Sequence, residues 1–223
     1  MLRDFSNKLF KPLLVLVSLF FVVLSVERVS IWRNTGTLWA DVVSKYPTSS
    51  YAQRNLGTYL HKTGNMTEAR VHLETALRLK PDIPDAHYNL GVIWMDQGDF
   101  DKALEEFDLA TGYKPEFVEP LATSAFIYSK KGDLEKSIEL YKKALIWDPQ
   151  GGYLHLNLAI VYNMKGEKDL ALNECLQAIK LESKLVKAHE MLGQIYKEFG
   201  RQADADQEFI VADNLVKEGR GIR

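Results

Sequence analysis

Residues 84–117 read PDAHYNLGVIWMDQGDFDKALEEFDLATGYKPEF, and a variant of this pattern recurs every 34 residues along most of the chain. Glycine marks the period at five places: Gly64, Gly98, Gly132, Gly166 and Gly200. Proline keeps the same spacing in another phase: Pro47, Pro81, Pro115 and Pro149. A fixed period of this length is typical of stacked helix pairs. The sequence therefore predicts an all-α fold.

Residue types recur inside each repeat when the glycine is numbered position 15. The repeats then begin at Ser50, Pro84, Val118, Gly152 and Val186. Positions 8 and 20 carry small residues, positions 7, 11 and 24 mostly large ones, and position 27 is always alanine. We expect helix A over about positions 1–13 and helix B over about positions 18–30. Glycine ends the first in a left-handed cap and proline ends the second.

This register resembles the tetratricopeptide repeat from Ser50 to about Lys217, with no insertion or deletion between repeats. The resemblance implies a right-handed α-solenoid of five helix pairs with a concave groove, in which neighbouring repeats share one core. The predicted repeats are 50–83, 84–117, 118–151, 152–185 and 186–217. Repeat 3 carries Ser124 and Ser137 at core positions, so we expect the lowest local stability there.

The repeat phase also extends upstream of this array. Residues 38–45 look like a lone helix B within a junction over 31–49, with Trp39 at position 24. Residues 218–223 are expected to be a frayed tail. No further amphipathic helix follows repeat 5, so its exposed end could stack on another copy, and homo-oligomers are an open possibility.

An apolar stretch lies near the amino terminus, because no charged residue occurs between Lys11 and Glu27. We divide this region into a flank over 1–11 and a transmembrane anchor over 12–30. As a helix the uncharged part spans about 22 Å, and a snorkelling Lys11 extends it. A cleaved signal peptide and a buried core helix are the alternatives.

Charges around the stretch predict the orientation of the chain in the membrane. Arg3, Lys8 and Lys11 precede it, whereas Arg28 and Arg33 follow it. The positive-inside rule then places the repeats on the exported side, periplasmic or lumenal.

Groove residues are expected at positions 2, 5, 6, 9, 12 and 13 of helix A, by resemblance to other tetratricopeptide arrays. Asn55, Asn89 and Asn157 share position 6 and resemble the asparagine ladder of O-GlcNAc transferase-like proteins. Such amides can pair with an extended peptide backbone, or they can bond only to neighbouring helices or water. The predicted groove also includes a set of larger side chains: Arg54, Tyr88, Val92, Phe126 and Ile160. A carboxylate clamp is not expected, because Glu119 and Thr123 stand where that clamp needs basic residues.

Signs of catalysis, metal binding or nucleic-acid binding are weak in this sequence. His87, His155 and His189 share position 4, which normally packs against neighbouring helices, so we expect no metal. The single cysteine, Cys175, falls at position 24 and is expected to be buried. A net charge of −2 gives no reason to expect nucleic acid. We therefore expect a binding protein without a cofactor, and not an enzyme.

The junction from Val26 to Pro47 resembles the end of the membrane part in polytopic tetratricopeptide proteins related to protein O-mannosyltransferases. Only the terminal portion of that family is covered, so no catalytic residue is implied. Three hypotheses follow: a membrane-anchored scaffold that binds a partner segment, an accessory subunit of a membrane glycosyltransferase, and a self-assembling module.

Overall fold

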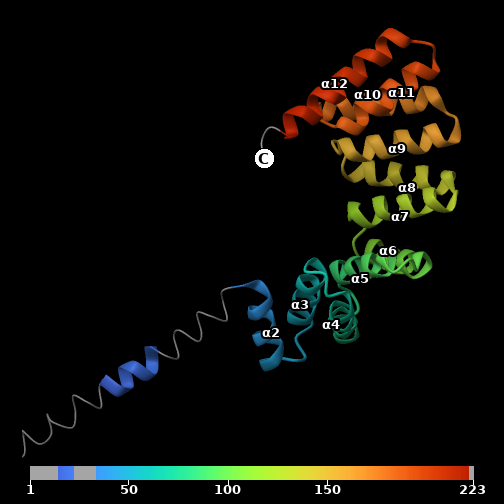
Figure 1. The fold of residues 1–223 in the computed structure, drawn as a ribbon. Helices are drawn as coiled ribbons and strands as arrows, with labels where there is room; N and C mark the ends of the chain where they lie inside the picture. The colour runs from blue at the N-terminus through green and yellow to red at the C-terminus, as the bar shows by residue number, and fades with distance from the viewer. Residues whose placement is uncertain (1–14, 23–33, 221–223) are drawn as a thin grey trace, which may run out of the picture. The chain divides into compact units, whose positions relative to one another are not determined.

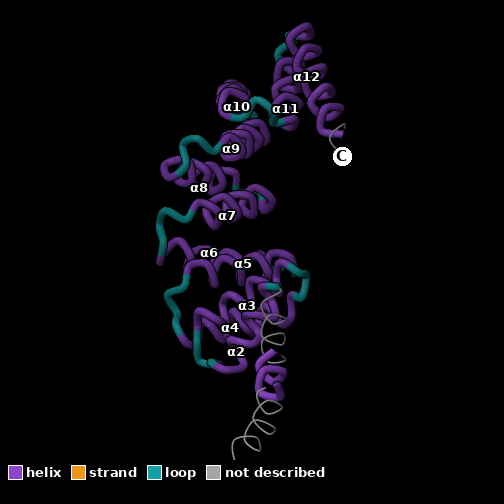
Figure 2. Tube along the Cα trace, turned by 90° about the vertical axis from the view of Figure 1, so that its left-hand side faces the viewer, coloured by secondary structure: helices purple, strands orange, loops and turns teal. Residues whose placement is uncertain are grey.

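The computed structural model describes residues 15–22 and 34–220, and every regular element in these ranges is a helix (Figures 1 and 2). Residues 15–22 form one short helix. The helices of the longer range are α2 (Thr35–Lys45), α3 (Ser50–Lys62), α4 (Met66–Leu79), α5 (Pro84–Asp96), α6 (Phe100–Tyr113), α7 (Val118–Lys131), α8 (Leu134–Trp147), α9 (Gly152–Lys165), α10 (Lys168–Leu181), α11 (Val186–Glu198) and α12 (Gln202–Arg220).

The chain divides into two compact parts, one up to Ile93 and one from Trp94 onward. In the amino-terminal part, α3 packs against both α2 and α4. In the carboxy-terminal part, α7 pairs with α8, α9 with α10 and α11 with α12, and α8 and α10 each also contact the pair that follows. The prediction of an all-α array of helix pairs is therefore confirmed within each part.

Helix A ends where the sequence predicts, at the periodic glycines. All five have a positive φ between 74° and 86°, and no other residue of the described chain does. Gly132 and Gly166 are the C-caps of α7 and α9. A side chain is strained in this conformation, which is why glycine recurs at position 15.

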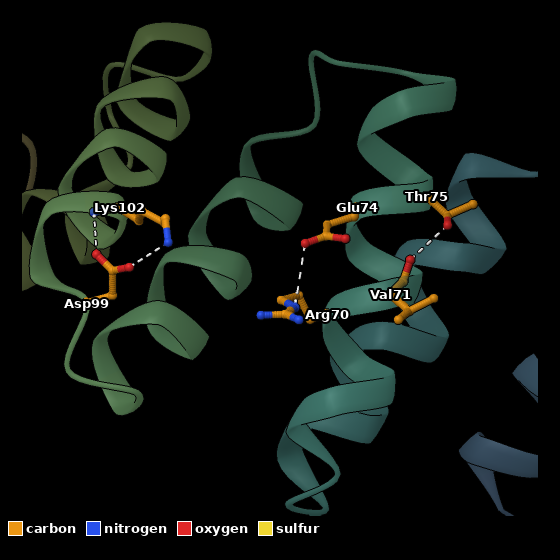
Figure 3. A network of polar contacts seen from close by, with 6 residues as sticks. All are labelled: Arg70, Val71, Glu74, Thr75, Asp99 and Lys102. Carbon is orange, nitrogen blue, oxygen red and sulfur yellow. Dashed lines mark hydrogen bonds and ion pairs between the residues drawn. The ribbon is translucent and has the colours of Figure 1, made fainter.

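Helix B begins with a side-chain cap in three of the repeats. Asp99 accepts a hydrogen bond from the backbone N–H of Lys102 at 3.3 Å, and its carboxylate also pairs with the Lys102 ammonium at 2.7 Å (Figure 3). These hydrogen bonds hold the pKa of the Asp99 carboxyl below its ordinary value. Asn65 and Asp133 cap α4 and α8 in the same way, whereas Glu167 at the same position makes no side-chain cap at the start of α10.

Close contact between the two helices of a repeat depends on the small residues at positions 8 and 20. A Cβ added to Gly57 would lie 2.8 Å from Cγ of Leu73 and 3.0 Å from the backbone oxygen of Ala69. Leu73 and Ala69 are fully buried. The expected roles of positions 8, 20 and 24 are therefore confirmed in repeat 1.

The ends of the array are less buried than its interior. Position 24 is essentially inaccessible in repeats 1 to 4, but Phe209 on α12 is 36% exposed. Trp39 on α2 is half-buried, and its ring packs edge-to-face on Tyr51 at 5.4 Å. The predicted capping helix is therefore present, with a tryptophan that is only partly covered.

The last helix is longer than the repeat pattern predicts. The expected tail begins at Glu218, yet α12 continues to Arg220. Repeat 5 carries Lys217 where repeats 1 to 3 carry proline, so nothing in the backbone stops the helix there.

The predicted membrane anchor over 12–30 lies largely outside the described residues. Within the described ranges, no helix combines the length and the apolar character that crossing a membrane requires.

Candidate functional site

The predicted groove residues fall into two sets, one in each compact part of the chain. Arg54, Asn55, Tyr88, Asn89 and Val92 belong to the amino-terminal part. Phe126, Asn157 and Ile160 belong to the carboxy-terminal part, where they line one cavity together.

This cavity has a volume of about 120 Å³ and lies between helices A of repeats 3 and 4. Its residues come from α7 (Phe126, Ser129 and Lys130), α8 (Tyr141) and α9 (Asn157, Ile160, Val161 and Met164). Phe126 and Met164 are 46% and 54% exposed, so two large apolar side chains face solvent beside it. Exposed apolar residues gathered at a hollow are typical of a binding surface.

Tyr141 and Lys130 define the chemistry at the floor and the rim of this cavity. Tyr141 is 2% exposed, and burial raises the pKa of its phenol to about 12, so the ring remains neutral. The Lys130 ammonium lies 5.3 Å from the centre of the Phe126 ring, a cation–π distance. The cavity is therefore apolar inside, with a positive charge at one edge.

Asn157 places a polar side chain without a hydrogen-bond partner in the described ranges at this cavity. It is half-buried, and its side chain makes no hydrogen bond to any residue that the structure describes. A half-buried amide without a partner retains its capacity to donate and to accept.

The two asparagines of the amino-terminal part differ from each other. The Asn89 amide donates to the hydroxyl of Thr58 at 3.2 Å and to the carbonyl of Asp85 at 2.7 Å. Its nitrogen therefore bonds within the fold, as the alternative interpretation expects. By contrast, Nδ2 of Asn55 is buried and finds no acceptor among the described residues.

The remaining predicted residues in this part are partly covered. The Arg54 guanidinium lies 5.1 Å from the centre of the Tyr51 ring, and its Nε is buried without a partner in the described chain. Tyr88 and Val92 are half-buried on α5. Arg54 thus forms an aromatic contact within the fold.

The structure also shows polar pairs that the sequence analysis missed. His155 Nδ1 lies 2.6 Å from the Glu174 carboxylate, and His189 Nδ1 lies 2.6 Å from that of Glu208. In each pair the histidine is at position 4 of helix A and the glutamate at position 23 of helix B. The sequence does carry a signal for these pairs, because in both repeats a glutamate follows the histidine after 19 residues. These histidines therefore tie the two helices of a repeat together.

Cys175 is fully buried in the core of repeat 4, as predicted. Burial raises the pKa of its thiol to about 12. The side chain is therefore an uncharged packing group rather than a thiolate nucleophile.

Comparison with known families agrees with the helix pairing. Residues 55–115 and 119–150 match models described as tetratricopeptide repeat. These two ranges therefore carry tetratricopeptide repeats. No curated protein matches the sequence. The matches begin at residue 55, so the resemblance of the 26–47 junction to O-mannosyltransferase-like proteins stays a prediction.

Three solved structures illustrate the likeness of the fold. A crystal structure of MamA is 18% identical, with a TM-score of 0.69, covering 74% of this chain and 97% of MamA. YrrB, described as a tetratricopeptide protein with an unusual peptide-binding site, is 14% identical with a TM-score of 0.67, covering 79% and 91%. PilF from Pseudomonas aeruginosa is 18% identical with a TM-score of 0.68, covering 74% and 75%. The fold is one that typically serves as a non-catalytic scaffold.

Proposed function

We propose that this chain is a scaffold that binds an extended segment of a partner protein. The observation that carries the proposal is the cavity between α7 and α9, where the amide of Asn157 has no partner beside the exposed ring of Phe126. An amide can pair with a peptide backbone of any sequence, and the apolar cavity can receive one side chain. YrrB, a protein of the same fold, is described as having a peptide-binding site, which supports the proposal that this chain binds a peptide segment.

The amino-terminal set contributes an apolar contact in this proposal. Tyr88 and Val92, both half-buried, supply it, whereas Nδ2 of Asn55 is buried and out of reach of a partner. Asn89 acts mainly by holding helix A in place, because both hydrogens of its amide have acceptors within the chain. We give the cavity near Asn157 the larger share of the binding energy.

A random peptide library displayed on phage and selected against the full chain tests the proposal. The affinity of an enriched peptide is then measured by fluorescence polarisation for Phe126→Ala and Asn157→Ala. We expect a loss of roughly thirtyfold for Phe126→Ala, the size of an interface hot spot. For Asn157→Ala we expect the affinity to fall by roughly threefold to tenfold, which corresponds to the loss of one hydrogen bond.

Matched control variants remove similar side chains outside the cavity. Ile146 is 72% exposed at the end of α8, and Asn173 is exposed on α10. Ile146→Ala and Asn173→Ala should bind as the unaltered chain does. Peptides that bind all four variants equally well would place binding elsewhere and contradict the proposed site.

We also propose that residues 12–30 anchor the chain in a membrane. Within the described helix 15–22, seven large apolar side chains are between 45% and 63% exposed, which supports burial of this helix in something other than the chain itself. After an alkaline carbonate wash, the full chain should stay in the membrane pellet, while a chain beginning at Asn34 should be released. Release of both would contradict the anchor.

The proposed side of the membrane is the exported one, periplasmic or lumenal. The support is the excess of basic residues before the apolar stretch over those after it. Protease added to sealed vesicles of known orientation should cleave the repeats only when the exported side of the membrane faces the medium. Cleavage from the cytoplasmic side alone would reverse the assignment.

Self-association is the second candidate function, favoured by one observation on α12. Phe209 and Ile210 are 36% and 57% exposed, although the residues equivalent to Phe209 are buried in repeats 1 to 4. Light scattering should then show a molecular mass that rises with protein concentration. The variant Phe209→Ser should reduce this rise. A constant monomer mass would exclude this function.

A further inference from the structure

A second cavity lies on the same helices as the proposed peptide site, nearer to their amino-terminal ends. Its volume is about 460 Å³, and it lies in the carboxy-terminal part of the chain. The apolar lining includes Val118 and Ala122 on α7 and Leu154 on α9, together with Tyr153, which is 61% exposed. The two cavities thus occupy the two ends of one surface formed by α7 and α9.

The second cavity has a strong excess of negative charge. Four carboxylates line it, those of Glu116, Glu119, Asp148 and Glu182, against the single ammonium of Lys114. The Lys114 ammonium lies 4.8 Å from the centre of the Phe117 ring rather than beside a carboxylate. None of the four carboxylates forms an ion pair with any residue in the described part of the chain.

The first cavity carries the opposite charge at its far edge. Lys130 lines it, and no carboxylate does. A peptide that lies along α7 and α9 therefore meets a positive group at one end and several negative groups at the other. A basic side chain is attracted at the second cavity and repelled at the first, which fixes how the peptide is placed.

The helix geometry sets the spacing between the two contacts. Glu119 and Phe126 are seven residues apart on α7, as are Tyr153 and Ile160 on α9. A rise of 1.5 Å per residue separates the members of each pair by about 10 Å along the helix. An extended peptide covers that distance in about three residues.

We propose that the partner segment carries an apolar residue and a lysine or arginine about two to four positions apart. The apolar side chain enters the cavity beside Phe126 and Asn157. The cationic side chain enters the cavity beside Glu116, Glu119 and Tyr153, where the aromatic ring adds a cation–π contact. The inference rests on the proposed function and adds the chemistry of the partner.

The peptides enriched on the full chain provide the first measurement. The enriched sequences should contain a basic residue two to four positions from an apolar one more often than the starting library does. Replacing that basic residue by norleucine, which keeps the alkyl chain and removes the charge, should weaken binding by roughly tenfold. Added salt should weaken the binding of the basic peptide and leave the binding of the norleucine peptide nearly unchanged.

A double variant that removes two of the carboxylates of the second cavity provides the second measurement. Glu116→Gln with Glu119→Gln should weaken the basic peptide roughly threefold to tenfold and leave the norleucine peptide unaffected. Glu105→Gln is the control, because Glu105 is exposed on α6 and outside both cavities.

The two proposals fail in different ways. Enriched peptides that depend on Phe126 but lack a basic residue, or that ignore the glutamine substitutions, overturn this inference and leave the proposed function standing. Enrichment of no peptide at all overturns both.

Discussion

Repeats 3 and 5 join their two helices at the same two positions with different chemistry. Repeat 3 carries Leu121 at position 4 and Leu140 at position 23, and both leucines are 8% exposed. Repeat 5 carries His189 and Glu208 at these positions, bonded at 2.6 Å. The same helix packing thus accommodates an apolar pair or a polar pair.

The histidine of repeat 5 also bonds to the turn that precedes its helix. Nε2 of His189 lies 3.1 Å from the carbonyl oxygen of Ser183, while Nδ1 lies against the Glu208 carboxylate. Both ring nitrogens of His189 therefore face oxygen atoms of the chain. The comparison teaches that position 4 can tie helix A to helix B and to the preceding turn at once, whereas leucine supplies packing alone.

The largest effect should follow from breaking the polar pair on one side. Glu208→Leu leaves Nδ1 of His189, whose side chain is 8% exposed, without its partner. Removing one partner of a buried pair typically costs about 3–5 kcal/mol, and the 20% exposure of Glu208 reduces the expectation to about 2–3 kcal/mol. The free energy of unfolding in urea measures the loss.

The matched control converts repeat 5 to the chemistry of repeat 3. The double variant His189→Leu, Glu208→Leu should recover most of the loss, ending within about 1 kcal/mol of the unaltered chain. A double variant as unstable as Glu208→Leu alone would show that the pair does more than join two helices.

The sequence predicts these repeats well where a single position has a single physical demand. Glycine at position 15 is required by a positive φ, and a small residue at position 8 is required by contact with position 24. Phe126, Asn157 and Ile160, which the sequence places on the groove side of helix A, do line one cavity, but the binding groove itself stays a prediction. The His–Glu pairs were missed, because position 4 accepts glutamine, histidine or leucine and only its partner 19 residues later explains the choice. The bonding of Asn89 to Thr58 was not predictable, since the partner lies on another repeat 31 residues away.

A second effect compares an interior repeat with the terminal one. Gly57→Ala would place a Cβ 2.8 Å from Leu73, which is fully buried and cannot move aside. We expect a destabilisation of about 1–3 kcal/mol. Gly193→Ala places its Cβ 2.7 Å from the ring of Phe209, but that ring is 36% exposed and can rotate.

For Gly193→Ala the gain in helix propensity, about 1 kcal/mol, should offset most of the strain. Thermal or urea unfolding of the two variants measures the difference. Equal losses at Gly57 and Gly193 would mean that the terminal repeat packs as tightly as the interior.

A smaller effect concerns the serine at position 20 of repeat 3, where every other repeat has alanine. Ser137 is fully buried, and its hydroxyl donates to the carbonyl of Ala125 at 2.7 Å. The hydrogen bond compensates for burying the hydroxyl, so Ser137→Ala should change stability by less than about 1 kcal/mol. The low stability expected for repeat 3 stays a prediction, and hydrogen exchange of the α7 and α8 amides checks it against those of α9 and α10.

The smallest effect is the pH dependence of stability that His72 gives to repeat 1. In repeat 1 the imidazole lies on helix B: Gln53 donates from Nε2 to the carbonyl of Pro47 at 2.8 Å, so its Oε1 accepts from Nδ1 of His72 at 2.7 Å. A neutral His72 imidazole that carries its proton on Nδ1 can make this hydrogen bond. The pKa of His72 lies below its ordinary value because burial disfavours the charged ring, although the Glu68 carboxylate acts in the opposite direction.

A lowered pKa in the folded state has a definite consequence for stability. As the pH falls below about 6.5, the unfolded chain binds a proton at this histidine more readily than the folded chain does, so stability is lost. His72→Gln keeps a donor for Gln53 and removes the titration. Between about pH 7 and pH 5, the unaltered chain should therefore lose more unfolding free energy than His72→Gln does. Urea titrations at each pH measure how stability changes with pH in the two chains, and parallel slopes would show that the partly buried ring of His72 does not resist protonation.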